Sequence, residues 1–177
     1  MSKVFTYFVV ILSVLLKKVK EKQIFHIIIA TGFGTGFSPF APGTVGAALA
    51  ALIWCALVVF LPSSLLLYAT IFLILLFTVL GIWSSNVLEP VWGKDPSRIV
   101  VDEMVGMWIA LLAITPADHW LYILLAFILF RLFDIFKPYG ISKMENFKGG
   151  VGIMMDDILA GIYSCILILI TKWLIII

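Results

Sequence analysis

Long apolar runs separated by short polar segments dominate the sequence. No Asp, Glu, Lys or Arg occurs between Lys22 and Glu89, and a helix needs about 20 apolar residues to cross a bilayer. This stretch therefore predicts two crossings, at 44–61 and 65–83, joined by a Pro-Ser-Ser turn. Further apolar runs predict helices at 104–114, extending toward residue 99, at 120–130, extending through residue 136, and at 158–177. The pattern predicts an all-α, polytopic membrane bundle of about five apolar helices.

Composition supports a chain that is solvated mainly by lipid. Of its 177 residues 63% are hydrophobic and 12% are charged, with a mean hydropathy of +1.19, whereas a soluble domain carries about 25% charged residues. The apolar run 4–16 is short for a crossing, and lysines rather than a cleavage site follow it. We therefore expect residues 1–30 to form a retained anchor, either interfacial or spanning, and 31–177 to form a single membrane-embedded domain.

Positive charges are distributed unequally between the predicted loops. If all five segments cross, the linkers 84–98 and 137–157 lie on the same side as residues 17–22. That side holds most of the basic residues: Lys17, Lys18, Lys20, Lys22, Lys94, Arg98, Lys137, Lys143 and Lys148. The positive-inside rule makes this side cytoplasmic. No basic run is long enough to suggest binding to nucleic acid.

Five carboxylates gather near the predicted cytoplasmic boundary, in three short segments: Asp102 and Glu103; Asp134, with Arg131 and Lys137 at helical spacing; and Asp156 and Asp157. Individual acids could cap helices or form local ion pairs. Two local cations cannot neutralise all five, but a divalent cation would, and clustered oxygen ligands suit Mg²⁺ together with a substrate phosphate. All five are therefore candidate metal ligands and catalytic groups.

A glycine-rich segment at 30–46 precedes the first long apolar run. Backbone N–H groups at Gly34, Thr35 and Gly36 could bind a phosphate, although a closely packed re-entrant turn explains the same glycines. His26 lies in an apolar run and His119 in the turn predicted on the opposite side, away from the acids, which argues against a histidine nucleophile or a Ser-His-Asp site. Metal-assisted attack on a phosphorylated lipid, by water or by a carboxylate, remains the chemistry that fits.

Four motifs together resemble the phosphatidylglycerophosphatase A family: "GFGTGFSPFAPGTVG" (32–46), "IVVDEMVGMW" (99–108), "FRLFDIFKP" (130–138) and "GGVGIMMDDILAG" (149–161). They occur in the family's order. The resemblance implies a Mg²⁺-dependent phosphatase of the bacterial cytoplasmic (inner) membrane, which removes the terminal phosphate of phosphatidylglycerophosphate. It places the five acids on the family's acidic positions and Arg131 and Lys137 on its basic ones.

Specific roles follow as hypotheses. Asp102, Asp156 and Asp157 are the strongest candidate ligands, with Asp134 a further one, and Glu103 is either a ligand or the base that deprotonates water. Arg131 would bind phosphate through its planar guanidinium and Lys137 as a point charge.

Two other functions are alternatives to the phosphatase. One is a CDP-alcohol phosphotransferase, but the Asp-Gly-x2-Ala-Arg signature of that class is absent from this sequence. A cation transporter or channel would need acids reaching both faces of the membrane, and the opposite face has only Asp118.

Overall fold

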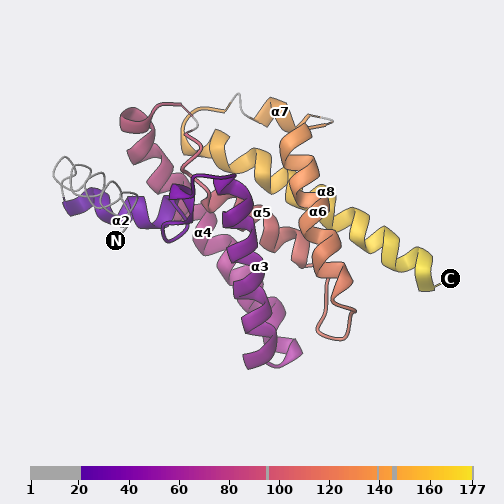
Figure 1. Ribbon diagram of the computed structural model, residues 1–177. Coiled ribbons are helices and arrows are strands. Elements are labelled where there is room, and N and C mark those ends of the chain that lie inside the picture. The colour runs from indigo at the N-terminus through magenta and orange to yellow at the C-terminus, as the bar shows by residue number, and fades with distance from the viewer. Residues whose placement is uncertain (1–20, 95, 139, 145–146, 177) are drawn as a thin grey trace.

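The protein is a bundle of helices in the computed structural model, which describes residues 21–94, 96–138, 140–144 and 147–176 (Figure 1). The predicted anchor segment 4–16 lies outside these residues. The described part of the chain contains helices and no strand, as the sequence predicted. In chain order they are α2 (Glu21–Ala30), the 3-10 helix η1 (Thr35–Phe37), α3 (Pro42–Phe60), α4 (Ser63–Trp92), α5 (Val101–Leu111), α6 (Leu121–Phe136), α7 (Ile141–Met144) and α8 (Gly150–Ile176).

Three of these helices, α3, α4 and α8, are long and apolar enough to cross a membrane. At 1.5 Å of rise per residue, the 19 residues of α3 extend about 28 Å, close to the thickness of a bilayer core. Helix α5 has only 11 residues and α6 has 16. Within the described residues, helix length and composition therefore do not confirm the prediction of about five membrane-spanning helices.

Two helices begin or end beyond the limits that the hydrophobic pattern predicted. Helix α4 continues from the apolar run through residues 84–92 and ends at Trp92, before Gly93, whose φ of +95° is left-handed. Helix α8 begins at Gly150 rather than at residue 158, so Asp156 and Asp157 lie inside the helix. The predicted linkers 84–98 and 137–157 are both shorter than expected for this reason.

Helix α5 is the centre of the bundle. Every residue from Val101 to Leu111 is buried except Glu103, which is half-buried, because α3, α4, α6 and α8 all pack around the helix. The indole nitrogen of Trp108 donates a hydrogen bond of 3.0 Å to the carbonyl of Ala50 on α3. This bond satisfies a polar group that would be costly to leave unpaired in an apolar interior.

Glycines allow α5 and α8 to approach closely. A Cβ at Gly161 of α8 would lie within 3.0 Å of the Cα of Gly106 on α5. A Cβ at Gly106 would overlap the ring of Phe130 and come 2.6 Å from the carbonyl oxygen of Asp157. Small residues at a helix crossing let backbones pack together where hydrocarbon supplies no hydrophobic force between helices. This crossing sets the position of Asp157 relative to α5.

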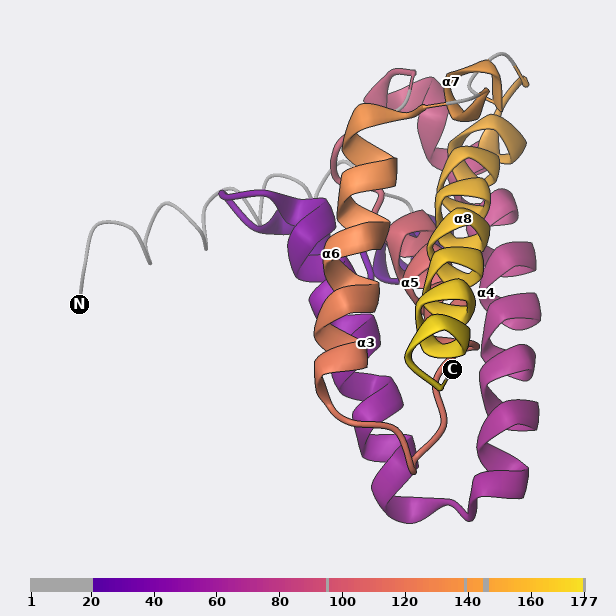
Figure 2. The same cartoon turned by 90° about the vertical axis from the view of Figure 1, so that its right-hand side faces the viewer.

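Helix α2 lies across the bundle rather than along it, as the two views show (Figures 1 and 2). It packs against α4, where the His26 ring nitrogen Nδ1 lies 3.1 Å from the hydroxyl oxygen of Ser84. Its last residue, Ala30, accepts a hydrogen bond of 2.8 Å from the backbone N–H of Val100. That bond fixes the residue before α5 and hence the start of the helix that carries Asp102.

The opposite end of the bundle contains the turn between α5 and α6 and the end of α8 (Figure 2). Lys172 lies 2.6 Å from the Asp118 carboxylate and donates to the carbonyl of Ala113. Partial burial raises the pKa of Asp118, but the hydrogen bonds from Lys172 and Thr115 outweigh it and hold that pKa below its ordinary value. Asp118 is thus paired with a cation far along the chain.

We expect Gly161→Ala to destabilise the protein, although alanine favours a helix over glycine by about 1 kcal/mol. The added methyl group must push α8 away from α5, and overpacking of this kind costs about 1–3 kcal/mol. The midpoint of thermal unfolding in detergent should fall, measured at one fixed scan rate.

The matched control for this substitution is Ala56→Val, which enlarges an exposed position on α3. It should leave the midpoint close to that of the wild type. An unchanged or higher midpoint for Gly161→Ala would show that the crossing is not closely packed.

Candidate active site

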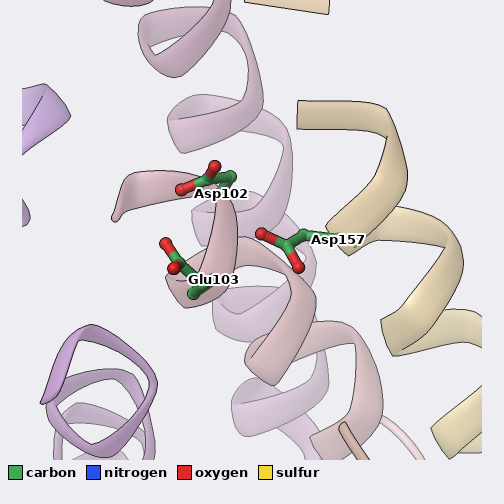
Figure 3. A group of neighbouring side chains, drawn as sticks. All are labelled: Asp102, Glu103 and Asp157. Carbon is green, nitrogen blue, oxygen red and sulfur yellow. The ribbon is translucent and has the colours of Figure 1, made fainter. Parts of the chain in front are cut away.

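Three carboxylates from two helices converge beside the central helix. Asp102 and Glu103 lie in the first turn of α5, and Asp157 lies two turns into α8. Each offers a carboxylate oxygen, and these oxygens all lie within 4.8 Å of one another. Figure 3 shows Asp157 pointing from α8 toward the two α5 side chains. We call Asp102, Glu103 and Asp157 the carboxylate group.

This group is buried and incompletely hydrogen-bonded. Asp102 is 6% exposed and Asp157 is 3% exposed. Within the described residues, one buried oxygen of each of the three side chains has no hydrogen-bond partner. The neighbouring charges are also unfavourable, since Asp134 and Asp156 add to the negative potential at Asp157. Ionised carboxylates buried in this way cost several kcal/mol each unless they are compensated.

A divalent cation fits this arrangement. Buried oxygens without partners are potential ligand atoms, and the three side chains that carry them each bring a carboxylate oxygen to within 4.8 Å of the other two. Mg²⁺ binds oxygen ligands, and it commonly uses one or two carboxylates together with water and substrate phosphate oxygens. The chemistry of these ligands suits Mg²⁺ better than a metal that prefers sulfur or imidazole.

Arg131 of α6 adjoins the carboxylate group. Its Nη1 forms a short ion pair with Asp134 and lies 3.9 Å from Oε1 of Glu103. The buried Nε of Arg131 has no hydrogen-bond partner among the described residues. The guanidinium is therefore held at the edge of the carboxylate group and retains a donor.

Asp156 and Lys137 form a second ion pair nearby. The Lys137 ammonium lies 2.6 Å from Oδ2 of Asp156, and Asp156 is 6% exposed. Lys137 occupies the position after α6 with a left-handed φ of +45°. Of the five predicted acids, the structure thus brings three into one group, while Asp134 and Asp156 contact the two predicted cations.

The glycine-rich segment forms a closely packed turn, which is one of the two interpretations that its sequence allowed. Gly34 has a φ of +97°, and the Thr35 hydroxyl donates to the carbonyls of Thr31 and Gly32. Gly36 packs against the Arg98 backbone, where a Cβ would overlap the carbonyl oxygen. These contacts fold the segment into a turn against the chain that leads into α5.

Gly43, the second residue of α3, was not singled out from the sequence. A Cβ at this position would overlap the Glu103 carboxylate and lie 3.2 Å from Nη1 of Arg131. Its position directly before the first predicted apolar run, 44–61, was the available signal. That signal did not reveal which neighbouring helix the glycine faces.

Comparison with known proteins identifies the family. The chain matches phosphatidylglycerophosphatase A over residues 28–172. A protein from Bacteroides thetaiotaomicron named putative phosphatidylinositol-3-phosphatase is 60% identical over 157 residues, which cover 88% of this chain and 99% of that protein.

Two further relatives are named phosphatidylglycerophosphatase A. The Escherichia coli K12 protein is 38% identical over 83% of each chain. The Haemophilus influenzae protein is 40% identical over 86% of this chain and 91% of its own. No solved structure matches the chain significantly. The family match and these relatives confirm the resemblance of the four motifs: the chain belongs to the phosphatidylglycerophosphatase A family and is a phosphatase.

Proposed function

We propose that this protein hydrolyses the terminal phosphomonoester of phosphatidylglycerophosphate to phosphatidylglycerol and inorganic phosphate, using Mg²⁺ bound at the carboxylate group. The observation that carries the proposal is the convergence of Asp102, Glu103 and Asp157 within 4.8 Å, beside the Arg131 guanidinium. The names of the Escherichia coli and Haemophilus influenzae relatives support this substrate. Membership of the family also argues against the phosphotransferase and transporter alternatives.

The protein's own residues would perform the following steps. Bound Mg²⁺ would supply positive charge that stabilises the phosphate oxygens as negative charge develops on them. Arg131 would donate hydrogen bonds to the same phosphate through its planar guanidinium, and Lys137 would add a second positive charge. Asp134 and Asp156 would orient these two cations, since each already contacts one of them.

Glu103 is the proposed general base. Its Oε2 is buried without a hydrogen-bond partner in the described part of the chain, so it could accept a proton from water held near the phosphate. A bond would form between that water oxygen and phosphorus as the bond to the glycerol oxygen breaks. The proton taken by Glu103 would balance the proton that the alcohol product gains.

The proposed location is the cytoplasmic boundary of the bacterial inner membrane. The end of α4, helix α7 and the start of α8 lie at one end of the bundle (Figure 2), and this end carries the described basic residues Lys94, Arg98, Lys137, Lys143 and Lys148. The positive-inside rule favours a cytoplasmic position for it. In this proposal α5 and α6 complete two further crossings, and the substrate's acyl chains remain in lipid.

A second candidate substrate is phosphatidylinositol 3-phosphate. The relative with 60% identity over nearly its whole length is named for this activity. Both lipids carry a phosphomonoester on a polyol, and that polyol is linked to diacylglycerol through a phosphodiester. The same attack on phosphorus would serve either lipid, so both belong in one activity assay.

We expect Asp157→Asn to reduce Mg²⁺-dependent phosphate release by at least about 100-fold, because it removes one charged ligand of the carboxylate group. Wild-type protein should also gain thermal stability with Mg²⁺, by about 2.7 kcal/mol at 100 times the dissociation constant. The variant should gain much less. Phosphate release and the thermal midpoint in detergent, each with and without Mg²⁺, measure these effects.

Asp118→Asn is the matched control, because Asp118 is paired with Lys172 at the other end of the bundle. Its phosphate release and its response to Mg²⁺ should match those of the wild type. Asp156→Asn completes the set, because it breaks the contact with Lys137. Full activity in both Asp156→Asn and Asp157→Asn would end the proposal.

We expect Gly43→Ala to lower kcat by about 10- to 100-fold, because the new methyl group must displace Glu103 and Arg131. Misplacement of a catalytic group by about 1 Å can cost this much. Steady-state kinetics on the lipid substrate measure the effect. Val45→Leu is the control, since it enlarges an exposed side chain in the same turn. Equal kcat values in the two variants would show that the space at Gly43 is not needed to position Glu103 and Arg131.

A further inference from the structure

A hollow lies between the end of α4 and the start of α8, and one of its lining residues, Asp156, directly precedes Asp157 in the chain. Its lining includes Glu89 and Lys94 from the α4 end and Gly149, Gly152 and Asp156 from the α8 side. The hollow has a volume of about 50 Å³ and is partly open to solvent. A single water molecule needs about 10–15 Å³ of such space, so the hollow admits a small polar group.

Contacts between α4 and α8 hold the walls of this hollow in place. The Asn86 side-chain oxygen accepts a hydrogen bond of 2.8 Å from the backbone N–H of Gly150. Gly149 has a left-handed φ of +67°, and a Cβ there would lie 3.7 Å from Oε2 of Glu89. The Glu89 carboxylate therefore lies against the turn that leads into α8.

Asp156 connects the hollow to the carboxylate group. Its side chain lines the hollow, and its charge acts on both Asp102 and Asp157. A lipid whose terminal phosphate lies at the carboxylate group could therefore place the next part of its headgroup in the hollow.

The charges that line the hollow match the chemistry of such a headgroup. Lys94 is exposed and Glu89 is half-buried, and neither forms an ion pair with another described residue. An ammonium suits a phosphodiester anion, and a carboxylate accepts hydrogen bonds from hydroxyl groups. Both candidate substrates contain a phosphodiester next to a hydroxyl-bearing polyol.

We propose that this hollow binds the inner part of the headgroup, with Lys94 at the phosphodiester anion and Glu89 accepting a hydrogen bond from a polyol hydroxyl. This inference rests on the proposed function and adds a specificity site to it. It selects lipids in which a polyol separates two phosphates. Phosphatidate, whose phosphomonoester is attached directly to diacylglycerol, would make neither contact.

The test compares Lys94→Met and Glu89→Met with the wild type as full-length protein in mixed micelles. Each variant should raise KM for phosphatidylglycerophosphate about tenfold, equivalent to about 1.4 kcal/mol, and keep kcat within about twofold. Inorganic phosphate, which reaches only the carboxylate group and its cations, should inhibit all three proteins with the same inhibition constant. Phosphatidylinositol 3-phosphate serves as the second substrate.

Lys143→Met is the matched control for charge, because it removes an exposed lysine from α7 at the same end of the bundle. It should leave KM unchanged, which separates a specific contact from general attraction to an anionic lipid surface.

Three results would overturn the inference while leaving the proposed function intact, provided that the wild type is active. They are an unchanged KM in both variants, a lower KM in Glu89→Met as simple charge repulsion predicts, and an equal weakening of inhibition by inorganic phosphate. If the wild type releases phosphate from neither lipid, the proposed function fails and the inference fails with it.

Discussion

The close crossing of α5 and α8 is the constraint on which the arrangement of the site depends. Gly106 and Gly161 bring the two backbones together, and this approach carries Asp157 to Asp102 and Glu103. A bulkier residue at either glycine would separate the helices, and the three carboxylate oxygens would no longer share one centre. Packing within the apolar interior and the chemistry of the site thus have the same structural origin.

Burial of so many acids is difficult to explain by stability alone. Apolar side chains of similar volume are often as stabilising as a buried ion pair, or more so. Here Arg131 and Lys137 contact Asp134 and Asp156, yet the carboxylate group still has buried oxygens without partners in the described structure. Departures from good packing and complete hydrogen bonding tend to occur at functional sites. The proposed cation would resolve the conflict, because it compensates the charge that the two basic side chains leave over.

Much of the fold could be predicted from hydrophobic runs, and the limits of the prediction have physical causes. The polar residues 84–86 suggested a loop, but Ser84 and Ser85 are buried on a continuing helix. A turn signal cannot be distinguished from a polar helix face without knowing what packs there. The 11 residues of α5 likewise look like part of a longer apolar run. Only its enclosure by four other helices explains why a short helix can remain in the interior.

The adjacent aspartates illustrate what sequence could not determine about the site. Successive residues of an α-helix point about 100° apart, and Asp156 and Asp157 contact different neighbours here. Asp157 points to the carboxylate group, whereas Asp156 contacts Lys137 and lines the neighbouring hollow. The orientation of α8 about its own axis determines which neighbour each aspartate contacts, and the close contact of Gly161 with α5 fixes that orientation. Under the proposed function, one doublet therefore serves two tasks: Asp157 binds the cation, and Asp156 connects the reacting phosphate to the pocket for the rest of the headgroup.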